Sequence, residues 1–223
     1  MKLFRSFPRS LLAAVLLATF AFVAPRVSQA SAPDPVVVFE TSMGRIIVML
    51  TPKQTPRTVD NFLRYVNEGF YDGTIFHRIV KKPIKRLSER ERDLAINIVQ
   101  GGGYSYPPRI KRPLWSPVRN EAAKGLQNDK GTIAMARADD PHSATCQFFF
   151  NVEDNPSLNP VAQKKQWGEI DEMVIRHGYT VFGRVIRGMD VVEKIHNVEI
   201  KNLPRLEGFP VKPVFVKKVY VTR

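Results

Sequence analysis

The chain has 223 residues, of which 43% are hydrophobic and 10% aromatic, and a formal net charge of +13 at pH 7. That length and hydrophobic content suit one domain with a sizeable core. A single cysteine, Cys146, excludes an internal disulfide, so the fold must rest on its core, and we expect Cys146 to be a small buried side chain.

Residues 1–30 have the pattern of a secretory signal peptide. Three basic residues precede the uncharged run of residues 11–23, and small residues follow up to Ala30. A membrane-spanning helix needs about 20 apolar residues, and this run is shorter than that. We therefore expect cleavage after Ala30, a mature domain of residues 31–223 and a periplasmic location.

The mature domain keeps a strong positive charge. Residues 1–30 hold four of the 34 basic residues and none of the 21 acidic residues, which leaves 30 basic residues, 21 acidic residues and a net charge of +9. This charge favours anionic partners but does not choose among nucleic acid, membrane surfaces and acidic proteins. Because an exported protein rarely meets nucleic acid, we expect no nucleic-acid partner. A weak contact with an anionic membrane surface stays open.

The first predicted elements are a β-hairpin and a helix. Residues 36–50 contain two Val- and Ile-rich runs around Gly44, which is typical of a hairpin turn. Residues 55–70 then change to a helical period, with Thr55 as the expected N-cap and Gly69 as the expected end. The apolar stripe of this helix faces the core and consists of Val59, Phe62, Leu63 and Val66.

Short strands dominate the rest of the chain. A second, short helix is predicted over residues 188–198. Many short strands with two helices favour a closed antiparallel sheet, because closure removes exposed strand edges. The predicted strands are residues 75–80, 96–100, 132–137, 147–152, 180–186 and 214–222.

Two segments do not fit the strand pattern. Residues 81–95 are rich in charge, and residues 159–178 also separate two predicted strands. We expect both to be surface insertions, which a barrel accepts at modest entropic cost.

Four separated motifs resemble cyclophilin-type peptidyl-prolyl cis-trans isomerases, and the exported bacterial branch above all. They are TVDNFLRYVNEGFYDGTIFHRIV, QGGG, GTIAMARADDPHSATCQFFFNV and YTVFGRVIRGMDVVEKI, in the order found in the family. The resemblance runs from about Val36 to Val221. It implies a mainly β fold, an eight-stranded antiparallel barrel capped by two α-helices. It also implies rotation about the bond before proline, proline-containing polypeptides as partners, and no cofactor.

The same resemblance assigns roles to individual residues. Arg78 matches the main catalytic group, and Gln100 matches the glutamine that supports it. Tyr179 stands where many relatives have histidine. The residues that match substrate-binding positions are Phe76, His77, Met135, Ala136, Ala138, Gln147, Phe149, Leu158 and Tyr179.

The chain departs from the family pattern at three positions. Asn97 and Ser157 replace aromatic residues of the substrate pocket, and Arg137 replaces an asparagine between two alanines. The alternative hypothesis is therefore a catalytically weak relative that binds extended peptides without accelerating their isomerisation. The side chains that could refill the pocket are those of Ile96, Ile98 and Trp167.

The residue types suit this chemistry. The barrier to rotation about a peptide bond is about 18–20 kcal/mol and reflects lost amide resonance. A catalyst must stabilise the twisted amide more than either planar form. Arg78 can donate to the twisted proline nitrogen because a guanidinium stays charged, and glutamines such as Gln100 and Gln147 can donate and accept. An apolar socket that includes Phe149 would fix the proline ring.

Other readings of these residues lead to different expectations. His77 is expected to be structural rather than a base, and alternation places at least one of the residues 148–150 away from the pocket. No metal-binding spacing and no serine-hydrolase elbow occurs, so we expect no metal, and we expect a monomer. A third hypothesis is an electrostatic adaptor that uses the basic runs 81–92 and 109–113.

Overall fold

The structure is a computed structural model that describes residues 33–82, 95–167 and 170–222. The predicted signal peptide and most of the predicted insertion at 81–95 lie outside these residues. Within the described ranges, no helix is both long enough and apolar enough to cross a membrane.

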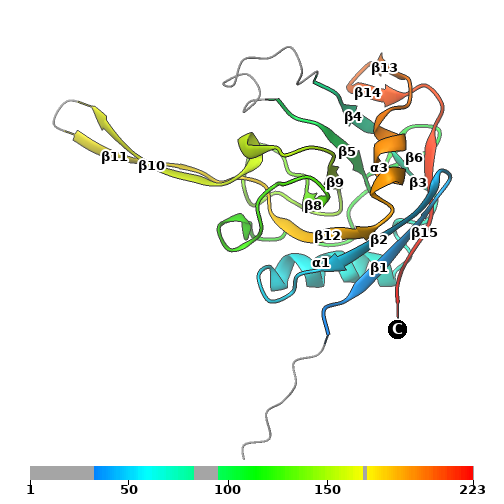
Figure 1. The fold of residues 1–223 in the computed structure, drawn as a ribbon, viewed down its shortest axis with the longest axis horizontal. Coiled ribbons are helices and arrows are strands. Elements are labelled where there is room, and N and C mark those ends of the chain that lie inside the picture. Colours follow the sequence, from blue (N-terminus) through cyan, green and yellow to red (C-terminus); the bar gives the residue numbers. More distant parts are fainter. Residues whose placement is uncertain (1–32, 83–94, 168–169, 223) are drawn as a thin grey trace, which may run out of the picture. The chain divides into compact units, whose positions relative to one another are not determined.

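The main sheet contains eleven strands, and each strand is antiparallel to its neighbours (Figure 1). In spatial order they are β4 (Arg78–Val80), β5 (Ile98–Gly101), β9 (Phe148–Asn151), β8 (Thr132–Met135), β12 (Val181–Arg187), β2 (Gly44–Leu50), β1 (Val36–Thr41), β15 (Val214–Val221), β3 (Thr74–Phe76), β6 (Tyr104–Ser105) and β7 (Arg109–Ile110).

The sheet curls so that β4, at one end of this order, continues directly from β3, the third strand from the other end. Only His77 separates β3, which pairs with β15, from β4, which pairs with β5. The backbone N–H of His77 donates to the carbonyl of Gln100 at 3.0 Å. The mainly β class is confirmed, but the strand count is not the predicted eight. The ladder is interrupted at His77, which divides one segment into two strands, and β6 and β7 are additional two-residue strands.

Helix α1 (Pro56–Asn67) begins with proline at its first turn, as predicted. Val59, Phe62 and Val66 are buried, because their spacing places them on one face. Thr55 makes no side-chain capping bond. Glu121, from a distant segment, accepts instead from the backbone N–H and the hydroxyl of Thr58, at 2.9 and 2.8 Å. The helix start follows from local sequence, whereas its capping group comes from tertiary structure.

Helix α3 (Met189–His196) contacts β2 and β5 and buries Val192 and Ile195. Two further hairpins form sheets of their own. One is β10 (Val161–Trp167) with β11 (Ile170–Arg176), inside the segment predicted as an insertion. The other is β13 (Ile200–Leu203) with β14 (Leu206–Pro210), which the sequence analysis did not predict. Single 3-10 turns occur at Ala122–Lys124 and Pro156–Leu158.

The core is rich in aromatic rings. Phe148 is fully buried, and its ring centroid lies 5.3 Å from that of Phe39, 5.4 Å from that of Tyr71 and 5.7 Å from that of Phe150. Cys146 is buried beside this cluster, as expected. These rings hold β1 and β9 against the segment that follows α1, and so they fix the strands from which the site is built.

Candidate functional site

Strand register brings the predicted catalytic residues into one row. Arg78 on β4 is opposite Gln100 on β5, Gln100 is opposite Phe149 on β9, and Phe149 is opposite Ala134 on β8. Residues that are directly opposite in neighbouring strands point to the same face of a sheet. Three side chains that are distant in sequence therefore lie side by side.

Hydrogen bonds hold the guanidinium of Arg78 in this row. Its Nη1 donates to Oε1 of Gln100 at 3.3 Å, and Nε2 of Gln100 donates to Oε1 of Gln147 at 2.9 Å. Among the described residues, no carboxylate forms an ion pair with Arg78. The positive charge is thus oriented by neutral groups and keeps its full attraction for a substrate lone pair.

An apolar floor lies next to Arg78. The residues from 148 to 150 alternate, with Phe148 and Phe150 in the main core and Phe149 in a second, smaller cluster. The rings of Tyr179 and Phe149 pack edge to face, with a centroid separation of 5.6 Å and an interplanar angle of 77°. The buried members of the second cluster are Ile98, Ala134, Phe149, Leu158 and Val181.

A groove of about 860 Å³ opens above this floor. Its volume is ample for a proline ring with flanking residues, and it places one charged fork beside an apolar socket. The predicted site residues that line it are Arg78, Gln100, Ala136, Phe149, Leu158 and Tyr179.

Other predicted site residues lie elsewhere. Phe76 and Met135 are buried in the main core, and Ala138 is exposed outside the groove. His77 and Gln147 line a smaller neighbouring cavity of about 360 Å³, which shares Arg78 with the groove. The tight packing of Gly103 against the side chain of Gln147 leaves no room for a Cβ atom. The run QGGG is therefore a packing element as well as a turn.

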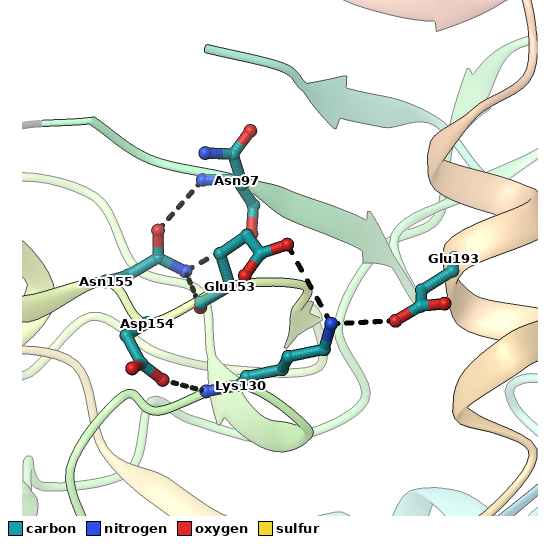
Figure 2. Close-up of polar contacts among 6 residues, drawn as sticks. All are labelled: Asn97, Lys130, Glu153, Asp154, Asn155 and Glu193. Carbon is teal, nitrogen blue, oxygen red and sulfur yellow. Dashed lines mark hydrogen bonds and ion pairs between the residues drawn. The ribbon is translucent and has the colours of Figure 1, made fainter. Parts of the chain in front are cut away.

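Neither of the two positions where the family has aromatic residues, Asn97 and Ser157, lines the groove. The side-chain Oδ1 of Asn97 accepts from the backbone N–H of Lys82 at 3.0 Å. Its backbone N–H donates to Asn155 Oδ1 at 2.8 Å, and Asn155 Nδ2 donates to its carbonyl at 3.2 Å (Figure 2). The side chains of Ile96 and Ile98 line the groove instead. Ser157 does not line the groove, and the side chain of Trp167 lies outside the described part of the chain.

The comparisons with known proteins agree with this geometry. The family model described as cyclophilin type peptidyl-prolyl cis-trans isomerase/CLD matches residues 36–221. The chain belongs to this family. A peptidyl-prolyl cis-trans isomerase of Streptomyces antibioticus is 40% identical, over 83% of this chain and 97% of that protein. Isomerase B of Escherichia coli is 38% identical, over 83% of this chain and 99% of that protein.

A solved structure also shares the fold. The cyclophilin-type isomerase of Cryptosporidium parvum, crystallised in the presence of the dipeptide Ala-Pro, has a TM-score of 0.60 and 23% identity. The match covers 84% of this chain and 99% of that one. This likeness supports the cyclophilin fold described above.

One wall of the groove in this cyclophilin-type isomerase was missed by the sequence analysis. The hairpin β13–β14 contributes Ile200, Asn202, Glu207 and Gly208 to the lining. The available local signals for a turn were Pro204 and Gly208. Position 205 has a φ of 67°, so the turn contains a left-handed residue.

Gly208 is the point at which this wall meets the strand of Arg78. Its φ is 64°, a Cβ atom there would collide with the carbonyl oxygen of Ile79, and its N–H donates to Asn202 Oδ1 at 3.0 Å. Only glycine allows β14 to approach β4 so closely. The hairpin therefore lies directly beside β4, the strand that carries Arg78.

We expect Gly208→Ala to move this wall, to lower the free energy of unfolding and to reduce kcat/KM. Gly73→Ala is the matched control, because Gly73 also has a positive φ, of 73°, but open space around its Cα. Left-handed strain costs about 1–2 kcal/mol in both variants, and the collision adds about 1–3 kcal/mol in Gly208→Ala alone. Equal unfolding midpoints in denaturant for the two variants would contradict the close approach.

His77 is a buried neutral side chain next to Arg78. Only 2% of its surface is exposed, and its Nδ1 has no hydrogen-bond partner in the described structure. Burial lowers the pKa of His77 to about 4, the charge of Arg78 adds to this shift, and the groups of Ile75 and Gln147 oppose it. A low pKa agrees with the structural role expected for this histidine.

This shift predicts a pH-dependent loss of stability. The unfolded chain binds a proton near pH 6.5, whereas the folded chain binds it only near pH 4. The contribution of neutral His77 is therefore complete above about pH 6.5 and is lost as the pH falls towards 4, by up to roughly 3 kcal/mol. Denaturant titrations of wild type and His77→Gln between pH 4 and 7 test this, because the variant should show a flatter profile. Parallel profiles would refute it.

Proposed function

We propose that this isomerase accelerates rotation about X–Pro bonds in extended segments of exported proteins, with Arg78 as the catalytic group. One observation carries the assignment. Arg78 is held by Gln100, free of any described carboxylate, in the same groove as the Phe149 floor. The floor would hold the proline ring while the preceding carbonyl swings.

The proposed catalysis needs no proton transfer. As the C–N bond twists, the proline nitrogen regains its lone pair and can accept a hydrogen bond from Arg78. The guanidinium interacts with this state more strongly than with either planar isomer, so the interaction lowers the barrier rather than only tightening binding. Gln100 and Gln147 would keep the fork in place, since they form a hydrogen-bonded chain to it.

The direct test is exchange between the cis and trans isomers of a peptide with one X–Pro bond. Exchange should accelerate in proportion to the concentration of wild-type protein. Peptide binding in calorimetry without acceleration would support the alternative, a module that binds extended peptides without turning them over.

The proposed periplasmic role rests on the signal-peptide pattern of residues 1–30. Sequencing the N-terminus of the protein recovered from the periplasmic fraction should show a chain that begins at Ser31. A protein that keeps residue 1 and stays in the cytoplasmic fraction would contradict export. We also propose a monomer, which light scattering of the mature protein would test.

A further inference from the structure

Arg137 is a second guanidinium in the groove, and it is held in a defined position. Its Cζ atom lies 4.6 Å from the centroid of the Tyr179 ring. Its Nε donates to the carbonyl of Gly178 at 3.3 Å, and its Nη1 donates to the carbonyls of Ala138 and Asp139 at 2.9 and 3.2 Å. These contacts fix the side chain before a ligand arrives, which lowers the entropy cost of using it for recognition.

The charge of Arg137 is not neutralised by its neighbours. All of its contacts are with carbonyls and an aromatic ring, and no described carboxylate lies within ion-pair distance. Nη2 has no hydrogen-bond partner among the described residues. The fork therefore retains donors that a carboxylate could use.

The groove as a whole also carries a net positive charge. Among the described residues, four basic side chains line it, and Glu207 is the one acidic residue of the lining. Of the basic residues, Arg78 faces Gln100, and the ammonium of Lys81 donates to the carbonyl of Val198 at 2.6 Å. An acidic ligand side chain would thus meet a positive potential that is not already matched.

Arg137 lies close enough to the proline socket to read a neighbouring residue of the substrate. Its guanidinium lies over the ring of Tyr179, and the centroid of that ring lies 5.6 Å from that of Phe149, so only Tyr179 separates Arg137 from the apolar floor. An extended chain advances about 3.3–3.6 Å per residue. A substrate side chain within two residues of the proline can reach it.

We propose that Arg137 is a specificity-determining residue that selects substrates with Asp or Glu within two residues of the proline. The proposal rests on the proposed isomerase function and adds the class of preferred sequence. The carboxylate of the substrate would accept hydrogen bonds from the free edge of the guanidinium. Position 137 would then favour acidic over basic flanking residues by about two- to fivefold at low salt, the range of a partly exposed ion pair.

The test uses a set of peptides with one X–Pro bond and a single Glu, Gln or Lys at each of the two positions on either side of the proline. The affinity of each peptide is measured by calorimetry, and kcat and KM by isomer exchange. Wild type should prefer Glu to Gln to Lys at one position or more, mainly through KM, and the preference should shrink as salt rises.

Two variants separate this role from general charge. Arg137→Gln should bring the ratio of Glu to Lys affinities close to 1, and Arg137→Lys should restore part of the preference for Glu. Arg112→Gln removes one exposed cation that does not line the groove, so the ratio should persist. Because each ratio is taken within one variant, a general loss of binding cancels.

The outcomes are distinct for the two proposals. A wild type that binds all peptides equally, or an Arg137→Gln variant that keeps the full preference, overturns the role of Arg137 whether or not exchange is catalysed. A preference in calorimetry without any acceleration of exchange supports Arg137 and rejects the isomerase assignment for this chain.

Discussion

Arg78→Ala should lower kcat/KM for an X–Pro test peptide by about 10²–10³-fold. A loss of this size is typical when one preorganised donor to a developing charge is removed from an active site. The loss should fall mainly on kcat, because the interaction is made with the twisted amide rather than with the planar isomers. Isomer exchange at several enzyme concentrations measures it.

Arg78→Ala should leave the fold intact, so a loss of activity would not come from unfolding. Arg78 is only partly buried, and its side chain makes one hydrogen bond within the described ranges, to Gln100, so its truncation leaves the core intact. Thermal unfolding of the variant should stay close to that of wild type.

Two further variants sharpen the result. Arg78→Lys keeps the charge but loses the planar fork, and it should recover only part of the activity. Arg112→Gln removes a positive charge outside the groove and should leave the rate unchanged. If Arg78→Ala catalyses exchange as well as wild type, Arg78 is not the catalytic group.

Phe148→Ala should lower the free energy of unfolding by about 3–5 kcal/mol, the range for truncating a fully buried aromatic side chain. The ring of Phe148 contacts five other aromatic rings, and such a closely packed site cannot collapse to fill the space. Because domains are stable by only about 5–15 kcal/mol, this loss is large. Equilibrium unfolding in urea measures it.

Phe149→Ala is the matched control, one residue further along the same strand. Phe149 belongs to the smaller cluster and lines the groove, so its truncation leaves space that solvent can enter. It should destabilise the fold less and weaken substrate binding more, by roughly 1.5–3 kcal/mol of lost apolar contact. Phe148→Leu provides a milder core variant if Phe148→Ala does not fold. Equal effects of the two truncations on stability and on binding would contradict the placement of Phe148 in the core and Phe149 in the groove.

Alternation along strands explains which predicted site residues line the groove. Met135 and Ala136 are adjacent in sequence, yet Met135 is buried in the main core and Ala136 lines the groove. Successive residues of a strand point to opposite faces, so Met135 and Ala136 cannot both face the groove. The same rule predicted that at least one of residues 148–150 lies away from the pocket, and the structure places both Phe148 and Phe150 in the main core.

Phe76 shows where alternation fails. It lies two residues before Arg78 and would share its face on a regular strand, but it is buried in the core. The interruption at His77 between β3 and β4 breaks the period. That interruption is produced by pairing with β15 on one side and β5 on the other, so it is a property of the assembled sheet.

Local sequence patterns were enough to predict the family, the two helices and most strands of the main sheet. They also singled out Arg78, Gln100 and Phe149, which the structure brings together in one groove. These features depend on the spacing of apolar residues and on the order of short motifs, both of which can be read directly along the chain. Long-range contacts were needed for the row across β4, β5 and β9, the absence of Asn97 from the groove lining, the β13–β14 wall and the position of Arg137 over Tyr179. Each of these depends on contacts between segments far apart in the chain, which no local pattern specifies.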